Sequence, residues 1–197
     1  VTAADVYATW FVTHETKLLE RLRKNPKFEL GLHPNFNFLL KGDMSKGCDS
    51  EEILESLMNL VPEAKTVRSH SLTQSSFLLD LFKKAGLTHD CNFFIPAFSD
   101  IKLKPWFQWN GIVCVPFFWE DDVSCLYSHQ DNVLELTSQT SLKVFNFHPI
   151  HLFLNTEHLD RYEKSSHLRH NPDELIKYRY EGYGTRSKLK ELLKQEL

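Results

Sequence analysis

The chain has 197 residues, of which 42% are apolar and 25% are charged, and its formal net charge is −3. This size and balance are typical of one globular domain, so we expect a single domain over residues 1–197. The interspersed charges exclude the basic footprint of a nucleic-acid-binding protein, and no apolar stretch approaches the ~20 residues of an integral membrane segment. Because the sequence shows no signal peptide, it favours a cytoplasmic protein.

The first half of the chain alternates predicted strands and helices. Apolar runs and helical spacing predict, in chain order, a strand over residues 7–12, a helix over 15–24, a strand over 28–32, a helix over 50–60, a strand over 66–69 and a helix over 75–85. We expect Asp49 or Ser50 to cap the second helix and Gly86 to end the third. The alternation favours a parallel sheet with helical crossovers, so the predicted fold class is α/β, with either a barrel-like closed sheet or an open doubly wound sheet.

The second half of the chain continues with strands and ends with helices. Apolar runs predict strands over residues 91–95, 111–119 and 141–147, and helical spacing predicts helices over 159–165 and 173–197. The last stretch is rich in Lys and Glu, so we expect its charges to form a solvated face.

Four histidines stand in apolar runs or at their ends: His33, His70, His148 and His151. An imidazole in such a place needs a partner for each ring nitrogen, and a divalent metal and a proton in transit are the partners that carry chemistry. Because parallel strands end at one edge, where α/β folds place their sites, we expect the histidines from separate strand ends to meet in one pocket.

Five segments carry a resemblance to a known family. They are Ala8–Val12 (Ala-Thr-Trp-Phe-Val), Glu29–His33 (Glu-Leu-Gly-Leu-His), Arg68–Ser71 (Arg-Ser-His-Ser), Val115–Asp122 (Val-Pro-Phe-Phe-Trp-Glu-Asp-Asp) and Phe147–His151 (Phe-His-Pro-Ile-His). In this order they resemble the Ala-Thr-Phe-Phe strand, the Glu-Ile-Gly-x-His strand end, the arginine motif, the Trp/Asp segment and the late histidine of the polysaccharide deacetylase superfamily, the NodB-homology domain of carbohydrate esterases. The resemblance is closest to the branch found in bacterial surface-polysaccharide and lipopolysaccharide O-antigen biosynthesis.

The resemblance implies an incomplete (β/α) barrel, here with C-terminal helices, and a divalent metal held by one Asp and two His. It implies hydrolysis of an N-acyl or O-acyl group on a sugar. His33 matches the first metal ligand. Many relatives place the second ligand four residues later, where this chain has Asn37, so His70 is the expected substitute. Zn²⁺ suits these ligands best, although Fe²⁺, Co²⁺ and Ni²⁺ accept the same set.

The sequence departs from the family at its catalytic aspartate. The family's Asp-Asp motif precedes the Ala-Thr-Phe-Phe strand, but Asp5 has no tandem acid and no strand of its own before it. Either the sequence begins after that strand or the protein has lost it, and we expect an open sheet edge beside residues 7–12. Asp121 or Asp122 is the best candidate within the chain to replace the missing carboxylate.

The remaining candidates concern proton transfer. His148 is expected to act as general acid, or in its neutral form as base, with Asp121 or Asp122 holding its ring. The alternative is a packed histidine bonded to the backbone. His151 is expected only to support the site, because in a strictly extended chain it would face away from His148, with Pro149 as the residue that can break this extension. The alternative for the three acids Glu120, Asp121 and Asp122 is a polar turn.

Two further residues are candidates for binding substrate, together with His151. Arg68 can hold a carboxylate or a sugar phosphate with its fork of donors, and the alternative is a surface ion pair. Trp119 is expected to form a wall on which a sugar stacks.

The function favoured by the sequence is a metal-dependent hydrolase that removes an acyl group from a nucleotide-linked, lipid-linked or polymeric sugar. Its expected partner is therefore an acylated sugar or a polysaccharide precursor. The first alternative is a catalytically inactive relative that binds carbohydrate or acts as a scaffold. The second is an unrelated α/β protein whose strand-end histidines are structural.

Overall fold

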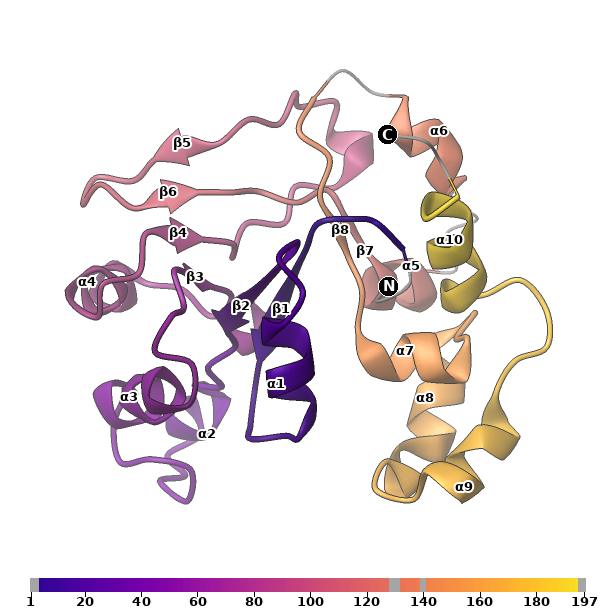
Figure 1. The fold of residues 1–197 in the computed structure, drawn as a ribbon, viewed down its shortest axis with the longest axis horizontal. Coiled ribbons are helices and arrows are strands. Elements are labelled where there is room, and N and C mark those ends of the chain that lie inside the picture. Colours follow the sequence, from indigo (N-terminus) through magenta and orange to yellow (C-terminus); the bar gives the residue numbers. More distant parts are fainter. Residues whose placement is uncertain (1–3, 128–131, 139–140, 195–197) are drawn as a thin grey trace. The chain divides into compact units, whose positions relative to one another are not determined.

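A computed structural model describes residues 4–127, 132–138 and 141–194 (Figure 1). The chain divides into two compact units, and each is described by itself. The first unit comprises residues 1–93 and 104–116, and the second comprises 94–103 and 117–197. The expectation of a single domain therefore stays a prediction.

The first unit is built on a six-stranded sheet. Its strands, in spatial order, are β1 (Ala8–Val12), β2 (Phe28–Leu32), β3 (Thr66–Val67), β4 (His89–Asp90), β6 (Val113–Cys114) and β5 (Trp106–Phe107), and Figure 1 shows this order from β1 up to β5. All neighbours are parallel except β5 and β6. This confirms the α/β class, and the described strands form an open sheet, as an incomplete barrel requires.

Strand β1 lies at one end of this sheet, and among the described residues β2 is its one strand partner. The open edge predicted beside residues 7–12 is therefore present. What covers that edge stays a prediction.

The helices of the first unit are α1 (Leu18–Arg23), α2 (Asn37–Leu40), α3 (Ser50–Leu60) and α4 (Ser76–Lys84). Asp49 caps α3 by accepting a hydrogen bond from the backbone N–H of Glu52, and Ser75 caps α4 in the same way. Gly86 follows α4 with a φ of 82°, the left-handed conformation that favours glycine at a helix end. The predicted caps are thus confirmed.

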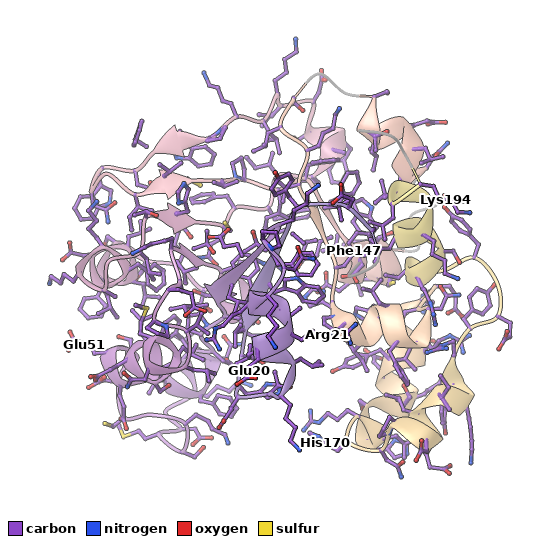
Figure 2. The ribbon with its side chains drawn as sticks, viewed as in Figure 1. Glu20, Arg21, Glu51, Phe147, His170 and Lys194 are labelled. Atoms are coloured by element: carbon purple, nitrogen blue, oxygen red, sulfur yellow. The ribbon has the colours of Figure 1, made fainter. Side chains whose placement is uncertain are left out.

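Charged residues of these helices face solvent while their apolar faces pack on the sheet. Figure 2 labels Glu20 and Arg21 of α1 and Glu51 of α3, all of which are exposed. The core behind them includes fully buried Leu32 and Phe82.

The absence of a side chain at Gly31 allows β2 to pack closely against β3. A Cβ at this position would overlap the hydroxyl of Thr66 on β3 and the ring of Phe11 on β1. Glycine therefore lets β2 pack closely between its neighbours, and this fixes the strand ends that carry His33 and His70.

The second unit combines one short parallel strand pair with several helices. The strands are β7 (Trp119–Glu120) and β8 (Phe145–Asn146), and the helices are α5 (Asp121–Leu126), α6 (Val133–Thr137), α7 (Pro149–Leu154), α8 (Leu159–Ser165), α9 (Pro172–Leu175) and α10 (Thr185–Leu192). Its core includes Leu103, Phe118, Trp119 and Val133. No helix in the described ranges is both long and apolar enough to cross a membrane.

Several predicted boundaries were wrong. The strand predicted over 91–95 is β4 at His89–Asp90, followed by an isolated bridge between Phe94 and Phe117. The strand predicted over 111–119 is divided into β6 and β7 around Pro116, which has no N–H to donate to a sheet.

The long final helix was also wrong. Its predicted span holds α9, a 3-10 turn and α10, which begins after Gly184, and residues 195–197 lie outside the described range. Two glycines within Glu-Gly-Tyr-Gly disfavour a continuous helix at this point.

Candidate active site

His148 and Asp121 meet because β7 and β8 are parallel and each runs directly into a helix. Asp121 is the first residue of α5, and His148 is the N-cap of α7, with Pro149 at the first helical position. One carboxylate oxygen of Asp121 lies 2.7 Å from His148 Nδ1, and the other accepts a 2.8 Å hydrogen bond from the His148 backbone N–H. Asp121 is fully buried. The prediction that a carboxylate holds the ring is confirmed.

Two more carboxylates surround the same imidazole. Glu120 is 7% exposed, accepts a 2.6 Å hydrogen bond from Asn146 Nδ2, and has an oxygen 3.9 Å from His148 Nε2. Asp122 accepts a 2.7 Å hydrogen bond from the backbone N–H of Val123. Asp122 therefore does not take the ring-holding place that Asp121 occupies.

The charges around His148 favour its protonated form. Burial alone would lower the pKa of His148, but the hydrogen bond and charge of Asp121, with the charges of Asp122 and Glu120, outweigh it and raise the pKa above its usual value. The ring is therefore suited to donate a proton.

His151 follows His148 by one helical turn, because α7 begins at Pro149 and the chain is not extended here. The two ring centres lie 5.9 Å apart, and His151 Nδ1 lies 3.1 Å from Thr156 Oγ1. Burial lowers the pKa of His151, although the charge of Asp121 acts against this. The expected opposite orientation was wrong. His151 is 4% exposed, and a role in substrate binding stays a prediction.

His33 and His70 lie near each other, just beyond the carboxyl ends of the neighbouring strands β2 and β3. Their strands pair through Leu32 and Val67, and the backbone N–H of His70 donates a 2.8 Å hydrogen bond to the carbonyl of Pro34. The ring centres are 5.7 Å apart and the rings are nearly perpendicular. The convergence of their ring nitrogens on one metal stays a prediction.

The turn that carries His70 has an unusual backbone. Ser71 and Leu72 both have φ near +54°, a conformation that costs non-glycine residues about 1–2 kcal/mol each. Asn37 Nδ2 donates a 2.9 Å hydrogen bond to Ser71 Oγ, and Asn37 Oδ1 accepts one from Thr73 Oγ1. Asn37 thus stabilises the turn that carries His70, the residue expected to replace the second ligand.

A polar network behind this turn was not predicted from the sequence. Asn92 Oδ1 accepts a 2.8 Å hydrogen bond from the backbone N–H of Ser69, and Asn92 Nδ2 donates to Asp90. The other oxygen of Asp90 accepts from Gln74 Nε2. Asp90 is fully buried, and burial raises its pKa despite the hydrogen bonds from Asn92 and Gln74. Asp90 was missed because the strand was predicted to begin one residue later.

The raised pKa of Asp90 makes the stability of the chain depend on pH. Because the folded chain binds this proton more tightly, the free energy of unfolding should fall as pH rises from about 4 through the raised pKa and then level off. Asp90→Asn should remove this component, since Gln74 can turn its amide to keep the contact. Urea unfolding of both proteins across this range measures the difference, and parallel curves would contradict the assignment.

Arg68 and Trp119 are both buried, at 5% and 4% exposed. The guanidinium of Arg68 lies 5.6 Å from the ring centre of Phe11, and the burial of Arg68 excludes a setting on the surface. Trp119 packs against Phe145 and Phe147, which leaves little of its face for stacking. Their roles in binding substrate stay predictions, as does the common pocket for His33 and His148, which belong to different units.

Comparison with known proteins identifies the class. The family model described as "WbmS-like: Polysaccharide deacetylase" matches residues 1–166, and the chain belongs to this family. A crystal structure from Bordetella bronchiseptica, of a proposed polysaccharide deacetylase (WbmS) involved in O-antigen biosynthesis, is 46% identical with a TM-score of 0.91. The alignment covers 98% of this chain and 80% of that one. Among curated proteins, none is similar enough to count as a match.

Proposed function

We propose that this chain removes an acyl group from an acylated sugar of a surface polysaccharide or its precursor, with His148 as general acid. The hydrogen bond between His148 Nδ1 and the buried Asp121 carries the proposal, together with the family. Water adds to the acyl carbon, the carbon–nitrogen bond breaks, and a proton from His148 Nε2 goes to the departing nitrogen. The products are a carboxylic acid and a free amine.

Asp121 prepares His148 for this step in two ways. Its contact with Nδ1 places the transferable proton on Nε2, and its contact with the backbone N–H fixes the start of α7. Its charge also keeps the imidazole protonated near neutral pH, which a general acid requires.

The family implies a divalent metal, and His33 and His70 are the residues we propose to hold it, with Zn²⁺ the expected ion. When bound, such a metal polarises the acyl oxygen and lowers the pKa of a bound water. Both carboxylate oxygens of Asp121 contact His148, so we do not propose Asp121 as a ligand of this metal.

A second donor set exists in the other unit. One potential ligand atom from each of Glu120, Asp122 and His148 lies within 4.8 Å of the others. A metal there would take His148 Nε2 and displace the proton that the acid needs. We therefore assign the proton to His148 and the metal to the other pair.

Metal binding by single variants separates these two assignments. His33→Ala and His70→Ala should lower the affinity for Zn²⁺ by at least the 10–100-fold that loss of a supporting partner costs, because each removes a ligand. Asp122→Asn is the matched control and should bind Zn²⁺ as the parent does. Elemental analysis after dialysis against Zn²⁺ measures this, and loss of metal from the control alone would move the site to the second unit.

The proposed activity is tested by acetate release from N-acetylated oligosaccharides and nucleotide sugars. We expect release that falls strongly when His148 is replaced and persists when the exposed His167 is replaced. Binding of the saccharide without any release would instead favour the inactive, carbohydrate-binding relative.

A further inference from the structure

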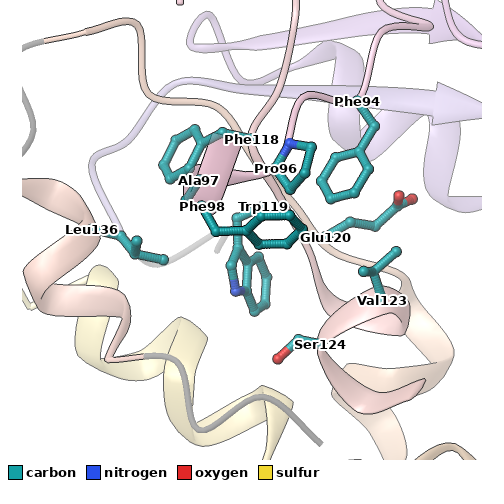
Figure 3. Close-up of a pocket in the computed structure, with 10 residues that line it drawn as sticks. All are labelled: Phe94, Pro96, Ala97, Phe98, Phe118, Trp119, Glu120, Val123, Ser124 and Leu136. Carbon is teal, nitrogen blue, oxygen red and sulfur yellow. The ribbon is translucent and has the colours of Figure 1, made fainter. Parts of the chain in front are cut away.

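The second unit contains a pocket of about 490 Å³ beside the active-site acids (Figure 3). Its walls are mostly aromatic and include Phe94, Phe98 and Trp119, while Glu120 and Ser124 supply polar atoms. The volume lies within the range of about 300–1,000 Å³ that is typical of small-molecule sites.

One wall of the pocket is a projecting segment that carries Phe98. The backbone of this segment is anchored at its base, where the N–H of Ile95 donates a 2.9 Å hydrogen bond to the carbonyl of Phe117. A 3-10 turn over Ala97–Ser99 then presents Phe98, which is 80% exposed. A large aromatic ring at the mouth of a pocket is the usual form of a surface that stacks on a ligand.

The opposite wall is held by α10, which lies beyond the residues matched by the family model. Lys188 Nζ donates a 2.8 Å hydrogen bond to Ser124 Oγ and lies 5.6 Å from the ring centre of Trp119. Trp119 and Ser124 are therefore fixed in place, whereas Phe98 is the exposed aromatic ring of the lining.

Glu120 connects the pocket to the chemistry. Figure 3 shows its carboxylate between the side chains of Phe94 and Val123, and the same side chain lies 3.9 Å from His148 Nε2. A ligand that contacts Glu120 from the pocket thus lies next to the proposed acid.

We propose that this pocket binds the pyranose ring of the acylated sugar, with Phe98 stacking on the C–H face of the ring and Glu120 accepting a hydrogen bond from a sugar hydroxyl. A sugar matches both surfaces, because it has an apolar face and polar edges. A long acyl chain does not, since it would place methylene groups against the Glu120 carboxylate without replacing its solvation. This inference rests on the proposed function and names a residue that sets its specificity.

The test compares Phe98→Ala with Phe107→Ala, because Phe107 is 78% exposed but belongs to the first unit. Affinity for N-acetylglucosamine oligosaccharides, measured by calorimetry, should fall about 3- to 10-fold in the first variant and stay unchanged in the second. Phe98→Trp should restore binding. In turnover assays Phe98→Ala should raise KM with kcat unchanged.

The binding experiment tests the pocket independently of the proposed reaction. His148→Ala should bind the oligosaccharide with the parent's affinity. If the parent chain binds the oligosaccharide but shows no turnover, the proposed reaction is wrong and the proposed sugar pocket still holds. Equal affinities in the two phenylalanine variants would overturn the assignment. Absence of saccharide binding by the parent chain, or preferential binding of decanoate that Phe98→Ala weakens, would also overturn it.

Discussion

Replacing His148 by alanine should lower the rate of acyl release by about 10²–10⁴-fold, the share that a positioned general acid contributes. The effect should fall on kcat, because the variant removes a proton donor and leaves the proposed sugar pocket intact. Acetate release by the protein that carries this chain measures it. His167→Ala, at an exposed histidine of the same unit, is the matched control and should have the parent's rate.

The pH profile of kcat distinguishes a loss of proton transfer by His148 and Asp121 from a loss caused by misfolding. Since His148 must be protonated to act, kcat should decline as pH rises through its raised pKa. Asp121→Asn removes the charge that raises this pKa, so the decline should move to lower pH while the variant stays folded. An unchanged profile in Asp121→Asn, or undiminished release by His148→Ala, would remove the pair from the mechanism.

Long helices and strands were predicted from the sequence more accurately than short ones. Strand β2 and helix α3 were predicted with their observed bounds, because their apolar patterns run over five and eleven residues. Strand β4 has only two residues, His89 and Asp90, and both are polar-type side chains that give no strand pattern. Its existence depends on its neighbours β3 and β6, which are distant along the chain.

In the candidate site, too, some contacts could be predicted from the sequence and others could not. The contact between His148 and Asp121 could be predicted because both follow apolar runs that end in a parallel arrangement. The contact between Glu120 and Asn146 could not, because it depends on the register of β7 and β8, which pairs these two residues directly. The helical start at Pro149 was a signal that the sequence contained, since proline favours the first helical position.

Helix α7 follows His148 and is capped at its carboxyl end by Asn155. The polar contacts of Asn155 allow us to predict a loss of stability in a nearby glycine variant. Asn155 has a φ of 50° and ends α7. Its side chain donates to the carbonyls of Tyr180 and Gly182 at 2.9 and 2.8 Å, and it accepts from the backbone N–H of Arg186 at 3.0 Å. The backbone of Asn155 is therefore fixed from several directions.

Gly184→Ala should lower the free energy of unfolding by about 1–3 kcal/mol, the cost of overpacking a fixed interior. A Cβ at Gly184 would overlap the carbonyl oxygen of Asn155, a residue that the hydrogen bonds of its side chain hold in place. Gly182→Ala is the matched control, because there the atoms nearest to a Cβ belong to the side-chain ring of Tyr180, which can rotate away. Urea unfolding measures both variants. An equal fall in the free energy of unfolding of the two variants would show that the backbone of Asn155 can move. The end of α7 would then not depend on the hydrogen bonds of the Asn155 side chain.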